Sequence, residues 1–180
     1  MRTASRLFYA QGILNTGINQ IISESEVAKA SFYQHFPSKN DLVKACLVSY
    51  NSYIGETMER LAGQSATFRE FIGMWIEQLK KDMQLTYRGC PIAEAAFQVD
   101  PTNREMQEVV KNIIEGWYEH LEKIFTYMKH NGELSPEVDN RLLAQRMIHL
   151  HEGALTMWRL TNDVRYIDDL AAFMTDLMEF

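Results

Sequence analysis

Apolar residues recur at intervals of three and four along nearly the whole chain, and this periodicity limits the fold more than any other feature. The stripe from Met106 to Met128 keeps Ile113, Trp117 and Leu121 on one side of a helix. No segment alternates apolar and polar residues for long enough to predict a β-strand. The pattern predicts an all-α fold of about nine helices, at residues 2–11, 17–23, 27–34, 38–62, 67–87, 91–98, 102–131, 136–160 and 164–179.

Proline, glycine and capping residues agree with these boundaries. The prolines fall where helices are predicted to begin: Pro37, Pro91, Pro101 and Pro136. The glycines that fall at predicted helix ends are Gly12, Gly63, Gly89 and Gly132. Thr67–Glu70 and Thr102–Glu105 match the capping box, in which two side chains bind the first free amides of a helix. Ser135 is the predicted N-cap of the helix at 136–160.

The first three predicted helices are much shorter than all the others except the one at 91–98, and this run of three indicates a small head (residues 1–45) on a larger body (residues 46–180). Charge divides in the same way. The head has five Lys/Arg and three acids, a net +2, and the body has 13 Lys/Arg and 21 acids, a net −8, from totals of 18 and 24. The overall charge of −6 excludes a uniformly basic nucleic-acid binder, but it allows one whose basic charge lies in the head.

Residues 16–36 contain two short helical segments separated by a tight turn at residues 23–26. Small residues open the second segment, as a helix that enters the major groove of DNA requires, and polar side chains follow them. The side chains that would be exposed here are Lys29, Ser31, Tyr33, Gln34, His35 and Lys39. These residues alone are compatible with a DNA reader or with a small helical subdomain whose polar surface is ordinary.

The segment from Phe32 to Leu42, Phe-Tyr-Gln-His-Phe-Pro-Ser-Lys-Asn-Asp-Leu, resembles the signature of the tetracycline-repressor-like (TetR) transcriptional regulators. Leu7–Gly12, Thr16 and Ile18–Ile21 resemble the same family at the expected spacing. The resemblance covers about residues 3–47, a quarter of the chain. It implies an N-terminal helix-turn-helix domain that binds double-stranded DNA, joined to a helical domain for ligand binding and dimerisation.

The resemblance also implies roles for individual residues. It implies contacts with phosphate or sugar for Thr16, Tyr33, His35 and Lys39, and an approach to base edges or adjacent backbone for Lys29, Ala30 and Ser31. Thr16 would bind phosphate through its hydroxyl and the nearby helix amides. The amide of Gln34 offers one donor and one acceptor and could read adenine, and a solvated side chain is the alternative.

Three features depart from the family pattern. Glu26 occupies the turn position where the family has glycine, so it must adopt a positive φ or use a different turn, and it brings negative charge near DNA. Ile22 replaces a small residue, which predicts altered packing in the head. The chain begins at the edge of the first helix without a basic arm, which indicates either a shortened N-terminus or fewer phosphate contacts.

For the body, the resemblance implies a small-molecule cavity and a four-helix bundle between two copies of the chain. The large residues on the helices that would surround the cavity are Trp75, Leu79, Met83, Tyr87, Phe97, Trp117, Tyr118, Leu121, Met147, His151 and Trp158. A cavity of Met and aromatic residues suits flat, apolar ligands. The predicted dimer interface comprises Leu143, Leu150, Ala154, Met157, Leu170, Met174 and Leu177.

No other chemistry emerges from the sequence. Cys90 follows a glycine, as in one branch of the family, and is either a sensor or, more simply, a small buried hydrophobe. His149 and His151 are two residues apart and point to different faces of a helix, and His120 has no evident partner, so no metal site or cofactor is predicted. Glycine loops for phosphate and nucleophile motifs are absent, which argues against an enzyme.

The sequence therefore predicts a cytoplasmic, dimeric regulator, most simply a repressor, that a hydrophobic or aromatic effector releases from operator DNA. Two cysteines without a disulfide framework agree with a reducing compartment, and no apolar run is long enough to span a membrane. The alternative is a helical small-molecule-binding protein whose DNA binding is weakened.

Overall fold

The computed structural model describes residues 1–84, 89–98 and 102–177, and these residues form helices and connections with no β-strand among them. The helices are α1 (Arg2–Gln11), α2 (Ile18–Ser25), α3 (Lys29–His35), α4 (Lys39–Gln64), α5 (Phe68–Met83), α6 (Pro91–Gln98), α7 (Arg104–His130), α8 (Asn140–Thr161), α9 (Arg165–Asp168) and α10 (Leu170–Asp176). The all-α prediction is confirmed. The predicted terminal helix is interrupted at Asp169, whose φ of −75° and ψ of −19° are still close to helical values, so it is described as two helices.

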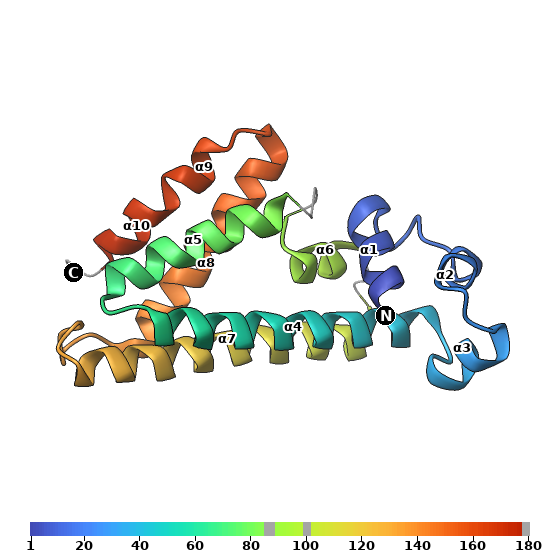
Figure 1. The fold of residues 1–180 in the computed structure, drawn as a ribbon, viewed down its shortest axis with the longest axis horizontal. Helices are drawn as coiled ribbons and strands as arrows, with labels where there is room; N and C mark the ends of the chain where they lie inside the picture. The colour runs from blue at the N-terminus through green and yellow to red at the C-terminus, as the bar shows by residue number, and fades with distance from the viewer. Residues whose placement is uncertain (85–88, 99–101, 178–180) are drawn as a thin grey trace.

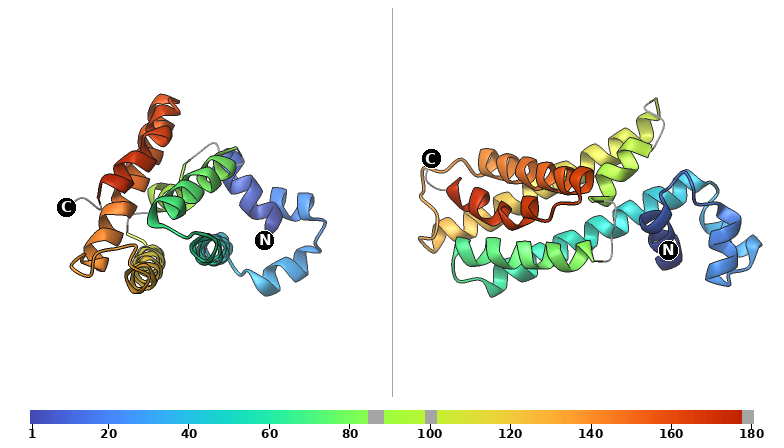
Figure 2. Two further views of the ribbon diagram at one scale, coloured as in Figure 1. Left: turned by 60° about the vertical axis from the view of Figure 1, so that its left-hand side comes forward. Right: turned by 90° about the horizontal axis from the view of Figure 1, so that it is seen from above.

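Helix α4 is the axis of the molecule (Figure 1). Helices α1, α2 and α3 gather at its N-terminal end, and α7 lies alongside it. Helix α5 packs on α4, and α8, α9 and α10 complete the body against α5 and α7. Two further views show the head on one side of the molecule and α9 and α10 on the other (Figure 2). None of the described helices is long and apolar enough to cross a membrane.

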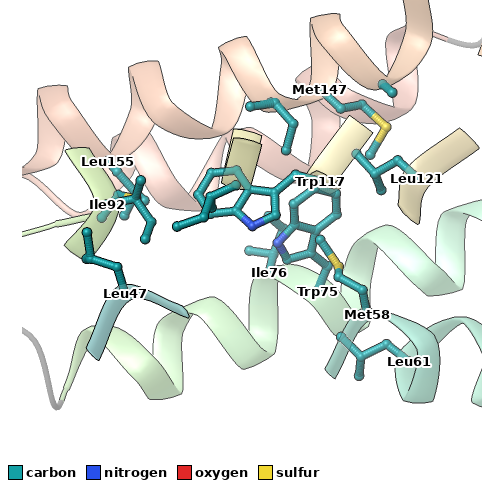
Figure 3. Close-up of a cluster of buried hydrophobic side chains, with 14 of the residues drawn as sticks. Leu47, Met58, Leu61, Trp75, Ile76, Ile92, Trp117, Leu121, Met147 and Leu155 are labelled. Atoms are coloured by element: carbon teal, nitrogen blue, oxygen red, sulfur yellow. The ribbon is translucent and has the colours of Figure 1, made fainter. Parts of the chain in front are cut away.

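One buried apolar cluster extends from Ala4 in α1 to Met174 in α10. Phe71 and Phe125 are completely buried in the body, and a close-up shows the indoles of Trp75 and Trp117 near the middle of this region (Figure 3). The first turns of α4 belong to the same cluster, since Cys46 is also buried. Because the head packs on α4 and α4 packs on α7, a movement of α4 within the body would carry the head with it.

Several helix ends agree with the sequence. The Thr67 hydroxyl accepts a hydrogen bond from the Glu70 amide at 3.1 Å, and the Glu70 carboxylate accepts one from the Ala66 amide at 2.8 Å. This reciprocal arrangement is the predicted capping box with one difference: the Glu70 carboxylate binds the amide of Ala66, the residue before the N-cap, instead of the amide of the N-cap Thr67 itself. Gly12 ends α1 with a φ of 87°, a conformation that glycine adopts without strain.

Three predicted ends are wrong. Helix α8 begins at Asn140 rather than at Pro136, because Asp139 and not Ser135 caps it, accepting from the Leu142 amide at 3.0 Å. Asn103 rather than Thr102 caps α7. Asp and Asn are at least as effective at this position as Ser and Thr, so the neighbouring residues supply the caps. Gly63 lies inside α4, which continues to Gln64, and Pro101 lies outside the described residues.

Candidate DNA-binding head and effector cavity

The turn between α2 and α3 is built around Glu26, which has φ 57° and ψ 26°, in the left-handed region. The chain therefore keeps the geometry of a glycine turn although the residue is not glycine. Extended Ala28 then starts α3. Phe32 is buried beneath α3, and this anchor directs the opposite side of the seven-residue helix to solvent. Ile22 lies partly buried against the core of the head.

The outward side of α3 carries most of the predicted DNA contacts. Lys29, Ala30, Tyr33, Gln34 and His35 are exposed, and Ser31 is partly buried. Positions 29, 30, 33 and 34 lie on one helix face, since residues three and four apart are neighbours. Lys39 is partly buried in the first turn of α4, and this burial lowers the pKa of its ammonium group. Seven of the eight predicted residues thus lie on or beside one surface.

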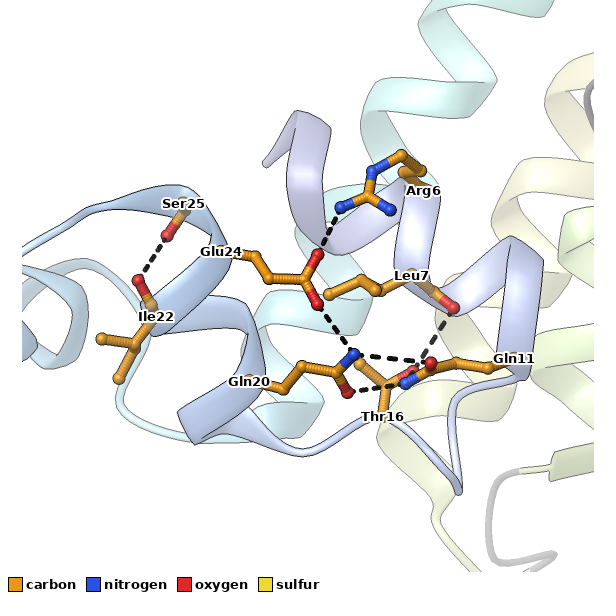
Figure 4. A network of polar contacts seen from close by, with 8 residues as sticks. All are labelled: Arg6, Leu7, Gln11, Thr16, Gln20, Ile22, Glu24 and Ser25. Carbon is orange, nitrogen blue, oxygen red and sulfur yellow. Dashed lines mark hydrogen bonds and ion pairs between the residues drawn. The ribbon is translucent and has the colours of Figure 1, made fainter.

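Thr16 is the exception. Its side chain is 0% exposed, and its hydroxyl donates to the Gly12 carbonyl at 2.7 Å. The carbonyl of Leu7 lies 3.4 Å from the same hydroxyl (Figure 4). The prediction that this hydroxyl binds phosphate is therefore wrong in this structure. Thr16 ties the end of α1 to the start of α2, because a buried hydroxyl requires an internal hydrogen-bond partner.

A polar network holds α1 against α2 (Figure 4). Arg6 pairs with Glu24 at 2.5 Å, Gln20 donates to Glu24 at 2.9 Å, and Gln11 donates to Gln20 at 2.7 Å. Lys44, another basic residue of the head, pairs with Glu105 of α7 at 2.6 Å and with a nearby aspartate. Two of the five cations in the head therefore already have acidic partners, which reduces the charge that it presents to DNA.

The strain at Glu26 leads to a prediction. Glu26→Gly is expected to raise the free energy of unfolding by about 0.5–1 kcal/mol, because a left-handed non-glycine residue costs about 1–2 kcal/mol, of which the greater flexibility of an unfolded glycine cancels a part. It should also tighten DNA binding by removing a negative charge. Glu26→Gln is the matched control, with tighter DNA binding but unchanged stability in urea unfolding. Equal stability of Glu26→Gly and Glu26→Gln would contradict the prediction.

The body encloses a narrow cavity of about 60 Å³ between α4, α5, α7 and α8. Six of the predicted ligand-binding residues line it: Trp75, Leu79, Met83, Trp117, Leu121 and His151. The cavity is also lined by apolar residues of α4 and α8 that were not predicted to bind ligand, among them Met58 and Leu155. Figure 3 labels several of the side chains that line this cavity, among them Trp75, Trp117, Leu121 and Leu155.

The other predicted ligand-binding residues do not line this cavity. Met147 is completely buried in the core and Trp158 packs against it. Tyr118 lies under Arg141, whose guanidinium carbon is 4.6 Å from the ring centroid. Phe97 is 77% exposed on α6. Tyr87 lies outside the described residues. Each of the four described residues is large and on a suitable helix, but it faces another direction.

Sequence reasoning missed the polar side of the cavity. Tyr50, Gln78, Asp82 and His120 line it beside the apolar residues. Asp82 accepts from the Gln78 amide at 3.1 Å and from the hydroxyl of Tyr53 at 3.0 Å. These groups lie on the sides of α4, α5 and α7 that face one another. Only a search for polar residues on the apolar stripes could have found them.

Two contacts at the cavity wall join α7 directly to α4. The Trp117 indole donates to Asn51 at 2.9 Å, and His120 lies so close to Gly55 that a Cβ there would be 3.1 Å from the imidazole Nε2. His120 also lies 3.4 Å from Glu59. Gly55 thus allows α7 to approach α4 closely, and any ligand that displaces Trp117 or His120 would disturb α4.

A second, more open pocket of about 490 Å³ lies between the α1–α2 loop, α6 and α8. A chain of polar contacts crosses it. The Leu14 amide donates to Gln98 at 3.3 Å, Gln98 donates to the buried carboxylate of Glu94 at 2.8 Å, and Glu94 pairs with Arg159 of α8. The head is therefore in hydrogen-bond contact with the body through α6 as well as through α4.

Both cysteines are free and buried. Burial raises the pKa of the Cys90 thiol well above its usual range, and the nearby carboxylate of Glu152 acts in the same direction. A protonated, buried thiol is a poor nucleophile, which favours the small-hydrophobe interpretation of Cys90 over the sensor interpretation. Among the described residues, no cluster of three or more His, Cys, Asp or Glu side chains could hold a metal ion.

The predicted dimer residues divide into two groups. Leu143, Leu170 and Met174 are buried within the single chain, so the prediction that they contact a partner is wrong. They fill the core because α8 and α10 pack on each other and on neighbouring helices of the same chain. Leu150, Ala154 and Leu177 are partly buried, and Met157 is exposed. Other large apolar side chains exposed on α8, α9 and α10 are Leu142, Leu160, Tyr166 and Phe173.

Comparison with known proteins identifies the family that has this arrangement. The profile of the N-terminal region of the "Bacterial regulatory proteins, tetR family" matches residues 1–46, and the profile "Tetracyclin repressor-like, C-terminal domain" matches residues 65–174. The chain belongs to the TetR family. It is therefore a transcriptional regulator with a helix-turn-helix head, in a family of regulators rather than of enzymes.

Relatives of this TetR-family chain match it over most of its length. The uncharacterized HTH-type transcriptional regulator YxaF of Bacillus subtilis (strain 168) is 29% identical over 167 residues, 90% of this chain and 83% of YxaF. A TetR-family regulator from Cytophaga hutchinsonii has the same fold, with a TM-score of 0.83 at 22% identity, covering 99% of this chain and 90% of that one. FadR from Bacillus subtilis, solved in complex with stearoyl-CoA, has a TM-score of 0.71 at 22% identity, covering 99% and 93%.

Proposed function

We propose that this TetR-family regulator is a cytoplasmic homodimeric repressor, which binds operator DNA through its heads and releases it when a small, largely apolar effector enters the cavity of the body. The observation that carries the proposal is that both sites share α4. The exposed helix α3 is fixed to the start of α4, and the cavity is lined by the middle of the same helix. The division at residue 45 therefore falls within α4, the element that would connect the two functions.

In the proposed complex, the outward side of α3 lies in the major groove of double-stranded DNA. Lys29, Ala30 and Ser31 approach the bases or the adjacent backbone, and Gln34 lies where its amide could pair with adenine. Tyr33, His35 and Lys39 contact phosphate or sugar. The exposure of α3 and the left-handed turn at Glu26 support this placement.

The dimer supplies the second head. We place its interface on the outward side of α8, α9 and α10, where Leu150, Ala154, Met157 and Leu177 are joined by the exposed Phe173. An isologous contact of two such helix pairs makes a four-helix bundle with two-fold symmetry. That symmetry matches two half-sites, whose major grooves lie about 34–36 Å apart.

Release follows from the small size of the cavity. A space of about 60 Å³ is well below the roughly 150 Å³ of a cavity that binds benzene, so an effector with even one ring must displace wall residues. Trp117 and His120 contact Asn51 and Gly55 of α4, and their displacement moves α4 and the head with it. A ligand that prefers the displaced state lowers DNA affinity by the same factor by which DNA lowers ligand affinity.

The proposal is tested by selecting binding sequences from a random DNA pool with the purified full chain. The expected result is a two-fold symmetric sequence bound by a dimer, with an affinity that falls steeply as salt is raised. The absence of any selected sequence from a folded, dimeric preparation would overturn the proposal. Mass spectrometry under native conditions would identify a co-purified effector, whose addition should release the selected DNA.

The observation that favours the alternative, a small-molecule-binding protein with weakened DNA binding, is the charge of the head. Arg6 and Lys44 pair with acidic residues, and Glu26 adds a negative charge to the turn. Effector binding together with weak DNA binding that shows no sequence preference would support this alternative.

A further inference from the structure

A chain of polar contacts joins the head to α8 without passing through α4. The amide of Leu14, in the loop between α1 and α2, donates to the Gln98 side chain at 3.3 Å. Gln98 donates to the Glu94 carboxylate at 2.8 Å, and Glu94 pairs with Arg159 of α8. We call these four residues the α6 bridge, because the two in the middle belong to α6.

Glu94 is the most constrained member of the α6 bridge. It is only 7% exposed, and its two carboxylate oxygens have different partners, Oε2 with Gln98 and Oε1 with Arg159. A buried carboxylate that loses its charged partner is left with an uncompensated charge, so the pair of Glu94 and Arg159 is costly to open. Gln98 lies one helical turn after Glu94, and its side chain therefore reaches the carboxylate along the same face of α6.

The loop at the head end of the bridge is also held in place. Asn15 donates to the Gln11 carbonyl at 3.0 Å, and the Gln11 side chain donates to the Asn15 carbonyl at 3.3 Å. The buried Thr16 hydroxyl donates to the Gly12 carbonyl at 2.7 Å. Because these contacts fix the loop to the end of α1, a restraint on Leu14 is a restraint on the whole head.

The other end of the bridge lies on a helix of the proposed dimer interface. Arg159 is two residues after Met157, an exposed residue of α8 that we place against the second copy. Helix α4, in contrast, joins the head to the wall of the cavity. The α6 bridge therefore ties the head to a helix beside the two-fold axis, while α4 ties it to the effector site.

We propose that the α6 bridge sets the distance and angle between the two heads of the dimer. Gln98 and Glu94 are then positioning residues that determine which spacing of half-sites the regulator accepts. This inference rests on the proposed function, in which a dimer binds a two-fold symmetric operator. One base pair added between the half-sites moves the second by about 3.4 Å and turns it by about 35° around the DNA axis. A head held to α8 must open the bridge to follow that change.

The test compares operators of different spacing. The operator selected from the random pool is prepared with its own spacing and with one base pair inserted or removed at its centre, and fluorescence anisotropy measures the affinity of the full chain for each. We expect the native chain to prefer the selected spacing and Gln98→Met to reduce this preference about tenfold, because methionine keeps the length of the side chain but cannot replace either hydrogen bond. An undiminished preference in Gln98→Met, or equal binding of all three spacings by the native chain, would overturn the proposal.

A merely structural role of Gln98 gives a different result. Loss of stability would weaken binding to all three spacings by one factor and leave their ratio unchanged. Gln64→Met is the matched control, since Gln64 is an exposed glutamine at the end of α4 that belongs neither to the bridge nor to the cavity lining. It should keep the native affinity and the native preference.

A double-mutant cycle tests whether the contacts act in series. Glu94→Gln should reduce the spacing preference as Gln98→Met does, because it removes the charge that holds Arg159. The double variant should lose no more than the larger of the two single losses, since one open contact already releases the head. Additive losses would show that the two residues act independently and would overturn the bridge.

A second measurement needs no DNA. Spin labels are attached to Lys29→Cys on α3 and Lys123→Cys on α7, which are exposed positions, whereas both native cysteines are buried. Labelled chains are diluted into unlabelled chains, and pulsed electron paramagnetic resonance gives the distribution of distances between head and body. We expect a narrow distribution with native Gln98 and a broader one with Gln98→Met. Equal widths would overturn the proposal.

Failure of the proposed function is distinguishable from failure of this inference. If the chain selects no operator, the regulatory function falls, and the role of the bridge in operator spacing falls with it. If the chain selects an operator and Gln98→Met keeps the native spacing preference, the regulatory function stands and only the role of the bridge falls.

Discussion

The double variant Tyr33→Ala/Lys39→Ala is expected to bind the selected operator roughly 100- to 1000-fold more weakly than the native chain. A dimer places each of these side chains on DNA twice, so four contacts are lost, each worth about 1 kcal/mol. The loss of two lysine–phosphate contacts should also reduce the slope of log affinity against log salt concentration by about two. Fluorescence anisotropy with labelled operator at several salt concentrations measures both effects.

Two controls separate DNA contact from folding. Tyr33 packs edge-on against the buried Phe32, with ring centroids 5.4 Å apart, so Tyr33→Phe keeps this packing and removes only the hydroxyl. It should lose affinity for DNA without losing stability. Lys123→Ala removes an exposed lysine from α7 of the body and should leave operator binding unchanged. Native affinity and salt slope in the double variant would show that α3 does not meet DNA as proposed.

The second large effect is expected from the dimer surface. Phe173 is 52% exposed on α10, although it is a large apolar residue. Phe173→Asp should convert the dimer into a monomer at micromolar concentration, because a two-fold axis buries two unpaired carboxylates in one interface. Operator affinity should fall by at least 100-fold, because the second head then no longer binds at high effective concentration. Sedimentation and anisotropy measure the two results.

The matched control for this variant is Tyr127→Asp on α7. Tyr127 is an aromatic residue with a similar exposure of 57%, and it lies outside the proposed interface. It should remain dimeric and bind DNA as the native chain does. A dimeric Phe173→Asp chain, or a monomeric Tyr127→Asp chain, would move the interface to another surface.

Thr16 and Met147 show that the sequence locates a residue along the chain but does not fix where its side chain points. Thr16 matches the family pattern, and its identity suggests a free hydroxyl, but the hydroxyl is buried against Gly12. Met147 lies on an apolar stripe of a cavity helix, yet it fills the core rather than the cavity. In both cases the position of the residue along the chain gave the right part of the molecule, and the direction of its side chain was not predicted correctly.

The sequence by itself determined the helices, the helix-turn-helix head and the surface that α3 presents, because helical periodicity, caps and turn residues act over a few neighbouring positions. It also identified Glu26 as a residue that must either adopt a positive φ or use a different turn, and the structure shows the first of these, with φ 57°. Only the tertiary structure decided that Leu143 and Met174 face inward and that Asp82 and Tyr50 face the cavity. A periodic stripe shows which side of a helix is apolar, but a cavity is the space that several packed helices leave unfilled, and its lining depends on how they are placed relative to one another.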